Sequence, residues 1–222
     1  MTKVIIFDMD DTLYREYDFV FGGFKVVANY IEKKYLINSN KIYDEIIDIF
    51  NKEGRGQIFD KICDKYKIDE DIKNLVDMYR YHNPNIKLYG DAEEILKWCK
   101  ENDIKTGLIT DGMSQVQWNK IKVLKLDKKI DKIIVSDDFG EEYWKPHIRT
   151  YKAILEYFNV KGENTIYIGD NPKKDFIGAK IMKINTIRIC RDTGDYSNII
   201  VEQALEAEKI IHSLIEIKNY LL

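Results

Sequence analysis

Short runs rich in isoleucine and valine alternate with stretches of helical spacing along most of the chain. The apolar runs cover residues 3–8, 104–110, 132–136, 165–170 and 185–189. All but the last are followed closely by a stretch in which apolar residues recur every three or four positions. Buried strands that alternate with helices are typical of a parallel sheet covered on both faces. The pattern therefore predicts an α/β fold with a doubly wound, mainly parallel sheet.

The segment between the first two apolar runs lacks this alternation and contains four sets of helically spaced apolar residues instead. The first set lies behind Asp18, a candidate N-cap, and the second ends near Gly54, a candidate C-cap. The other two sets lie within residues 58–66 and 69–79. We therefore predict an insertion of four helices after the first strand.

The sequence HNPN at residues 82–85 is typical of a linker and marks the return from the insertion. We expect a helical cap domain at 17–83 and an α/β core domain formed by 1–16 and 84–222. Near the C-terminus the pattern fits either one long amphipathic helix or a short edge strand at 209–211 followed by a helix that Ser213 caps. The second interpretation is favoured.

Composition and charge narrow the class of protein. The 222 residues are 45% hydrophobic and 33% charged, which is typical of a soluble globular chain with one sizeable core. The net charge is -3 and the lysines are interspersed with acids, so no nucleic acid polymer is expected as a partner. No apolar run has the length of a membrane span, and the N-terminus is not typical of a signal peptide. We expect a cytoplasmic monomer or homodimer without a membrane partner.

The cysteines and histidines do not suggest a disulfide framework or a zinc site. Cys63, Cys99 and Cys190 are odd in number, lie far apart and form no CxxC pair. The three histidines are scattered as well. Buried free thiols are therefore the expected state of the cysteines.

Polar side chains gather where the predicted strands end. Asp8, Asp10 and Asp11 follow the first run within four positions, and like charges this close resist ionising together. Because ligands bind at the carboxyl ends of strands in such folds, we expect one site there. Its candidate residues, taken from four places in the chain, are Asp8, Asp10, Thr110, Asp111, Lys145, Asp170 and Asp175.

These residues lie in four motifs that resemble those of the haloacid dehalogenase superfamily, the aspartate-nucleophile phosphohydrolases. DMDDT at 8–12 matches the first motif, DxDxT, and LIT followed by Asp111 matches the second. Lys145 matches the third, and GDNPKKD at 169–175 matches the fourth, GDxxxxD. The order and separation of all four motifs fit, and the helical insertion lies where members with a type-one cap carry it. The resemblance covers nearly the whole chain.

The resemblance implies a Mg²⁺-dependent phosphatase that hydrolyses a small phosphomonoester, such as a sugar phosphate, a nucleotide or a related metabolite. Asp8 would attack phosphorus and form an aspartyl phosphate. Asp10, held protonated by its anionic surroundings, would protonate the leaving group and later accept a proton from water. The resemblance implies that Mg²⁺ is held by Asp8, the backbone oxygen of Asp10, and Asp170. It implies that phosphate is bound by Thr110, Asp111 and Lys145. Asp175 and Thr12 would have supporting roles.

The chain departs from the family pattern at Asp111, where many related phosphatases carry Asn, and an additional carboxylate beside a dianion can alter substrate preference. Arg15, Tyr17 and Arg55 are candidates for substrate specificity at the cap. A phosphomutase of the same superfamily stays an alternative. A dehalogenase is disfavoured by Asp10, and a non-catalytic or phospho-switch binding domain is disfavoured by the complete set of motifs.

Overall fold

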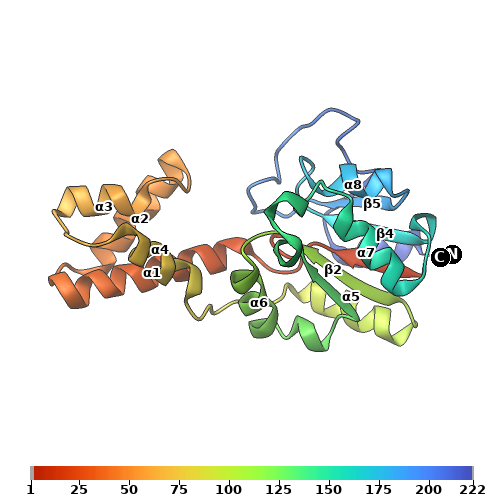
Figure 1. Cartoon of the computed structure of the whole chain (residues 1–222), viewed down its shortest axis with the longest axis horizontal. Coiled ribbons are helices and arrows are strands. Elements are labelled where there is room, and N and C mark those ends of the chain that lie inside the picture. The colour runs from red at the N-terminus through yellow and green to blue at the C-terminus, as the bar shows by residue number, and fades with distance from the viewer. Residues whose placement is uncertain (1–2, 222) are drawn as a thin grey trace. The chain divides into compact units, whose positions relative to one another are not determined.

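A computed structural model describes residues 3–221 and divides into two compact units. The core unit contains the chain up to Glu16 and from Ile86 onward, and the helical unit is Tyr17–Asn85. The first contains the sheet and the second contains helices alone (Figure 1). Within residues 3–221, no helix combines the length and the apolar composition that crossing a bilayer requires.

The core unit is built on one six-stranded sheet with the order β3-β2-β1-β4-β5-β6. All five pairings are parallel, so the prediction of a doubly wound α/β fold is confirmed. The strands are β1 (Val4–Phe7), β2 (Lys105–Thr110), β3 (Lys132–Val135), β4 (Thr165–Gly169), β5 (Asn185–Ile189) and β6 (Lys209–Ile211).

Strand β1 lies between β2 and β4, and its register sets the position of the candidate site. Phe7 pairs with Leu108 of β2 and with Ile168 of β4. Since β1 ends at Phe7, the next residue leaves the sheet beside the ends of both neighbouring strands. The carboxyl ends of β1, β2 and β4 therefore meet at one edge, as the candidate residues require.

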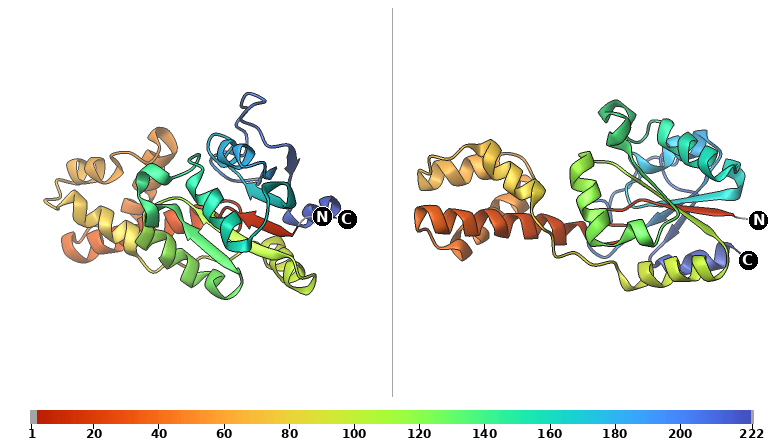
Figure 2. Two further views of the ribbon diagram at one scale, coloured as in Figure 1. Left: turned by 45° about the vertical axis from the view of Figure 1, so that its right-hand side comes forward. Right: turned by 60° about the horizontal axis from the view of Figure 1, so that its bottom comes forward.

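Helices cover both faces of this sheet. Figure 2 shows α5 and the C-terminal 3₁₀ helix on one face and α7 and α8 on the other. The helices are α5 (Gly90–Glu101), α6 (Ser114–Val123), α7 (Arg149–Phe158) and α8 (Asp175–Ile181), with 3₁₀ helices η1 (Leu126–Lys128), η2 (Ser136–Phe139), η3 (Glu141–Tyr143), η4 (Gly162–Asn164) and η5 (Leu214–Tyr220). Ile6 and Tyr167 pack with Tyr151 of α7 and Phe176 of α8 in one buried cluster. Burial on both faces explains why β1 is continuously apolar.

The helical unit has an apolar core of its own. Its helices are α1 (Glu16–Tyr35, whose first residue belongs to the core unit), α2 (Ser39–Glu53), α3 (Ile58–Tyr66) and α4 (Ile72–Tyr81), so the four predicted helices are present. The Phe24 ring stacks on Tyr79 with 5.3 Å between centroids and meets the Phe50 ring edge-on at 5.6 Å. Aromatic pairs in these arrangements stabilise the core beyond the area that they bury.

Two local predictions can be compared with the helix ends. Gly54 caps α2 with φ +79 and donates its N–H to the Phe50 carbonyl, as predicted. The prediction of Asp18 as the N-cap of the first helix is wrong, because α1 begins at Glu16. The Asp11 carboxylate accepts a hydrogen bond from the backbone N–H of Glu16 at 2.8 Å. The first N–H group of the helix therefore has a partner five residues upstream.

The C-terminal segment follows the favoured interpretation. Strand β6 forms the sheet edge next to β5, and Ser213 closes a capping box with Glu216. The following helix is 3₁₀ rather than α. All three cysteines are free: Cys63 and Cys99 are buried, and Cys190 is partly exposed.

Gly178 marks a close approach between α8 and the segment that follows Lys145, which generates a stability prediction. A Cβ at Gly178 would lie 2.5 Å from the Pro146 carbonyl oxygen. We expect Gly178→Ala to lower the free energy of unfolding by about 1–3 kcal/mol, because backbone must move to admit the methyl group. Urea unfolding measures the change.

Gly90→Ala is the matched control, since a Cβ there meets no atom within 4 Å. This variant should leave stability unchanged or raise it by up to about 1 kcal/mol. Equal stabilities of the two variants would show that α8 is not packed against Pro146 as described.

Candidate active site

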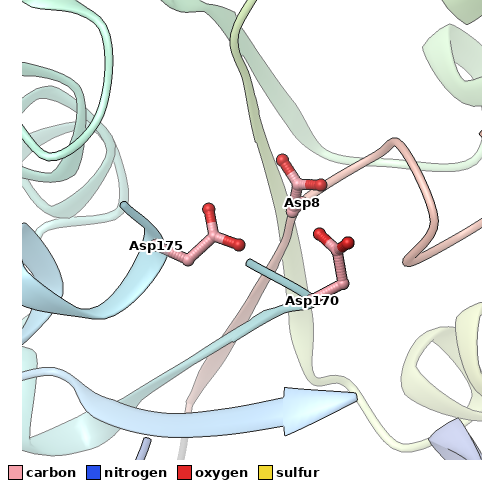
Figure 3. A group of neighbouring side chains, drawn as sticks. All are labelled: Asp8, Asp170 and Asp175. Atoms are coloured by element: carbon pink, nitrogen blue, oxygen red, sulfur yellow. The ribbon is translucent and has the colours of Figure 1, made fainter. Parts of the chain in front are cut away.

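Three carboxylates converge where β1 and β4 end. The Asp8 N–H still donates to the Ile168 carbonyl oxygen of β4 at 2.8 Å, which fixes the backbone at the point where the side chain leaves the sheet. Asp170 follows β4 directly and Asp175 is the first residue of α8. One oxygen from each of the three lies within 4.8 Å of the others, and Figure 3 shows the carboxylates converging. The fold thus brings together acids from two motifs far apart in sequence.

Lys145 places its ammonium group among these acids. Its Nζ lies 2.5 Å from Asp8 Oδ1 and 2.7 Å from Asp175 Oδ1, and it donates to the Tyr167 hydroxyl at 3.0 Å. The side chain is fully buried. Burial alone would lower the pKa of Lys145, but the charges of Asp175 and Asp8 raise it well above its usual value. The ammonium is therefore a permanent positive charge that orients Asp8.

One lysine does not balance three clustered acids, of which Asp8 and Asp175 are buried and Asp170 is partly exposed. Burial raises the pKa of Asp8 to about 7 although Lys145 acts in the opposite direction. Burial and the charges of Asp175 and Asp8 also raise the pKa of Asp170 well above its usual range. Within residues 3–221, no hydrogen bond or ion pair reaches the Asp170 carboxylate. Closely spaced oxygen donors that need positive charge fit a hard divalent cation such as Mg²⁺.

Asp10 has different surroundings from Asp8. Its Oδ1 accepts from the Tyr14 hydroxyl and from Lys120 Nζ at 2.8 Å, and its Oδ2 accepts from Gln117 Nε2 at 2.9 Å. Burial by itself would raise the pKa of Asp10, but the Lys120 charge and these hydrogen bonds outweigh it and the pKa is lowered. The expectation that anionic neighbours keep Asp10 protonated is therefore wrong for the free protein. Lys120, which lies 110 positions further along the chain, reverses the effect.

Gln117 and Lys120 are the functional candidates that the sequence analysis missed. Both lie on α6 and are almost completely buried. Gln117 Nε2 also donates to Thr110 Oγ1 at 2.6 Å, so one amide joins the first two motifs through Asp10 and Thr110. One feature of the sequence could have indicated them: Gln117 and Lys120 lie three positions apart, on the helix face that also carries the buried residues Val116 and Ile121.

The Asp111 carboxylate is turned toward lysines. Its Oδ1 accepts the backbone N–H of Lys145 at 3.2 Å, and its Oδ2 lies 3.2 Å from Lys174 Nζ. Burial would raise the pKa of Asp111, but the charges of Lys145 and Lys174 lower it instead. Asp111 therefore holds the backbone of Lys145 in place, a contact that the motif did not predict.

The remaining predicted residues lie in varied places. Thr12 is buried and its carbonyl oxygen accepts from Arg191 at 2.6 Å. Arg15 belongs to the core unit, whereas Tyr17 and Arg55 belong to the helical unit. The Tyr17 ring lies 5.8 Å from that of Phe50, and Arg55 is exposed in the turn between α2 and α3. A supporting role for Thr12 and substrate contacts of the other three stay predictions.

Known proteins resemble this chain over almost its entire length. The model of the family described as "Haloacid dehalogenase-like hydrolase" matches residues 5–189. A glyceraldehyde 3-phosphate phosphatase from Methanocaldococcus jannaschii is 30% identical over 96% of this chain and 99% of its own. One from Pyrococcus furiosus is 29% identical over 96% of this chain and 90% of its own. A HAD-hydrolase from Bacillus subtilis, solved bound to magnesium, has the same fold with a TM-score of 0.72 and 18% identity over 99% of this chain and 98% of its own.

The three converging carboxylates generate a prediction about cation binding. Mg²⁺ at about 100 times its dissociation constant should stabilise the folded protein by about 2.7 kcal/mol, seen as a higher thermal midpoint. Asp170→Asn should abolish this increase because it removes one anionic ligand. Asp103→Asn is the control, since Asp103 is exposed and has the positive φ of 55 that Asn accepts. An unchanged Mg²⁺ response in Asp170→Asn would exclude this carboxylate as a ligand.

Proposed function

The chain belongs to the haloacid dehalogenase-like hydrolases, and from this premise we propose that it is a Mg²⁺-dependent phosphatase that hydrolyses a small phosphomonoester through an aspartyl phosphate on Asp8. The observation that carries the proposal is the Asp8 carboxylate bound by the Lys145 ammonium beside Asp170 and Asp175. The names of the relatives favour a three-carbon sugar phosphate, and glyceraldehyde 3-phosphate is the first substrate to test. We propose that the enzyme meets it in the cytoplasm.

Asp8 is the proposed nucleophile. Its carboxylate oxygen attacks phosphorus while the bond from phosphorus to the ester oxygen of the leaving group breaks. Lys145 holds the carboxylate by a charge-assisted hydrogen bond and remains positively charged throughout. The same ammonium can therefore stabilise negative charge that develops on the transferring group. Thr110 and the backbone after it would bind the phosphoryl oxygens.

A divalent cation completes the charge balance of the proposed site. Asp8, Asp170 and the backbone oxygen of Asp10 would hold Mg²⁺, with Asp175 in support. When bound, the ion supplies positive charge between the anionic carboxylates and the anionic substrate. Lys145 already occupies one side of Asp8 and of Asp175, so Asp170 is the acid that depends most on the cation.

Asp10 is the proposed general acid and base. In the free protein Lys120 and Gln117 hold its carboxylate in one orientation, and it is ionised. A phosphoryl dianion arriving beside Asp10 raises its pKa, so proton uptake accompanies substrate binding. Asp10 then protonates the leaving alkoxide and takes a proton from the water that hydrolyses the aspartyl phosphate.

The helical unit is proposed to act as a cap that selects the leaving group. The support is its place in the chain: residues 17–83 follow the first motif directly, where members of the family with a type-one cap carry their insertion. Tyr17 and Arg55 are its candidate substrate contacts, and Arg15 precedes it.

The role of Asp8 predicts the outcome of one substitution. Asp8→Asn should lower phosphate release with Mg²⁺ by more than about 10⁴-fold, because the nucleophile is removed. A phosphate-release assay over a panel of metabolite phosphates that includes glyceraldehyde 3-phosphate measures it, with Asp103→Asn as a control of unchanged activity. Activity that survives in Asp8→Asn removes Asp8 from its role.

Phosphate released by the unmodified protein without any added sugar bisphosphate separates a phosphatase from a phosphomutase.

The role of Asp10 predicts burst kinetics. p-Nitrophenolate is a good leaving group and needs no acid, so Asp10→Asn should still transfer the phosphoryl group of p-nitrophenyl phosphate to Asp8. Hydrolysis of the aspartyl phosphate should then be slower by about 10²–10⁴-fold, because no base activates water. Stopped-flow absorbance should show a burst of one p-nitrophenolate per protein chain. Steady turnover at the rate of the unmodified enzyme would argue that Asp10 is not the base.

A further inference from the structure

Asp111 is a buried anion at the turn proposed to bind phosphate. It follows Thr110 at the end of β2, and its side chain is 3% exposed. Both of its oxygens are used: Oδ1 accepts the Lys145 N–H and Oδ2 faces Lys174 Nζ, each at 3.2 Å. Burial would raise its pKa, but the charges of Lys145 and Lys174, together with hydrogen bonds that its carboxylate accepts, among them that from the Lys145 N–H, keep the pKa low. A permanent negative charge therefore lies one residue from Gly112, in the turn that would receive a phosphoryl dianion.

Lys174 provides a positive charge that pairs with the Asp111 carboxylate. It directly precedes Asp175, and its side chain is 36% exposed, whereas that of Lys145 is fully buried. Asp111, Asp175 and Asp8 attract the Lys174 ammonium, and Lys145 repels it. Of these groups only Asp111 is within ion-pair distance of Lys174 among residues 3–221.

The two lysines near Asp111 have different tasks. Lys145 contacts Asp111 through its backbone N–H, while its ammonium is occupied by Asp8 and Asp175. The Lys174 ammonium is thus the charged group that pairs with the Asp111 carboxylate directly. Without it, Asp111 would keep only its hydrogen bonds and the charge of Lys145, which Asp8 and Asp175 share, and its carboxylate would repel a phosphoryl dianion more strongly.

We propose that Lys174 is a positioning residue for substrate binding: it neutralises Asp111 so that the turn after β2 can accept a phosphoryl group, and the two residues act as one unit. The inference rests on the proposed phosphatase function and adds a specificity element to it. Lys174 takes no part in bond making. Its removal should weaken the binding of any phosphate and leave the chemical step nearly unchanged.

A double-mutant cycle tests the pair. The proteins are the unmodified enzyme, Lys174→Met, Asp111→Asn and the double variant, with p-nitrophenyl phosphate as substrate and inorganic phosphate as competitive inhibitor, both with Mg²⁺. Lys174→Met should raise KM and the inhibition constant of phosphate by about 10-fold or more and change kcat by less than about 3-fold. In the Asp111→Asn background, Lys174→Met should raise KM and the inhibition constant of phosphate by less than about 3-fold, because no anion is left to neutralise.

Two further variants separate this role from general structural damage. Lys173→Met removes the exposed neighbouring lysine and should leave all constants unchanged. Lys174→Arg keeps the charge and should retain KM within about 3-fold of the unmodified enzyme. Thermal unfolding of every variant verifies that each is folded under the assay conditions.

The outcomes are distinguishable from failure of the proposed function. Equal losses from Lys174→Met in both backgrounds would mean that Lys174 contacts phosphate itself, and the inference of a neutralising pair would be wrong. An unchanged KM in Lys174→Met would overturn it as well. If the unmodified protein hydrolyses no phosphomonoester, the proposed function fails, and calorimetric titration of the same four proteins with inorganic phosphate and Mg²⁺ still measures the coupling.

Discussion

The shared ion pair of Lys145 with Asp8 and Asp175 is the interaction on which the candidate site depends. A parallel sheet brings the carboxyl ends of its strands to one edge, and in this chain those ends carry acids. Acids that are both buried and close together are costly to ionise. The buried ammonium of Lys145 offsets two of them and orients Asp8. The acid that it does not reach, Asp170, is where additional positive charge is most needed.

Asp8 and Asp10 illustrate how neighbouring residues acquire different chemistry. Both are aspartates that follow β1. Burial raises the pKa of Asp8 to about 7, whereas the Lys120 charge and the hydrogen bonds from Lys120, Tyr14 and Gln117 lower the pKa of Asp10. Helix α6 causes the difference, because Lys120 and Gln117 both approach the Asp10 carboxylate. Unlike surroundings for two acids close together in the chain are a recurring basis for separate roles in catalysis. The pKa of Asp111 is likewise lowered by nearby lysine charges, and Lys174 is its ion-pair partner.

Much of the fold could be predicted because its signals are local. Each apolar run contains the strand predicted from it, and four sets of helical spacing became four helices. The predicted helix start was wrong at α1, because the side chain that accepts its first backbone N–H is not the nearest polar residue in the sequence. Asp18 precedes the first apolar positions of α1, but the acid that accepts the first N–H of the helix is Asp11. The sequence pattern also could not show that the helix after Ser213 is 3₁₀, because a capping box looks the same before either type.

The sequence by itself determined the alternation of strands and helices, the place of the helical insertion and the family motifs that contain Asp8, Lys145 and Asp170. These features depend on periodicity and on residues within a few positions of one another. Only the tertiary structure decided which cation each acid meets, and therefore which acids are charged. Lys120 reaches Asp10 across 110 positions and Lys174 reaches Asp111 across 63. A lysine among many has no local signal for its partner, because the packing of α6 and of the loop before α8 against the end of the sheet brings the charges together.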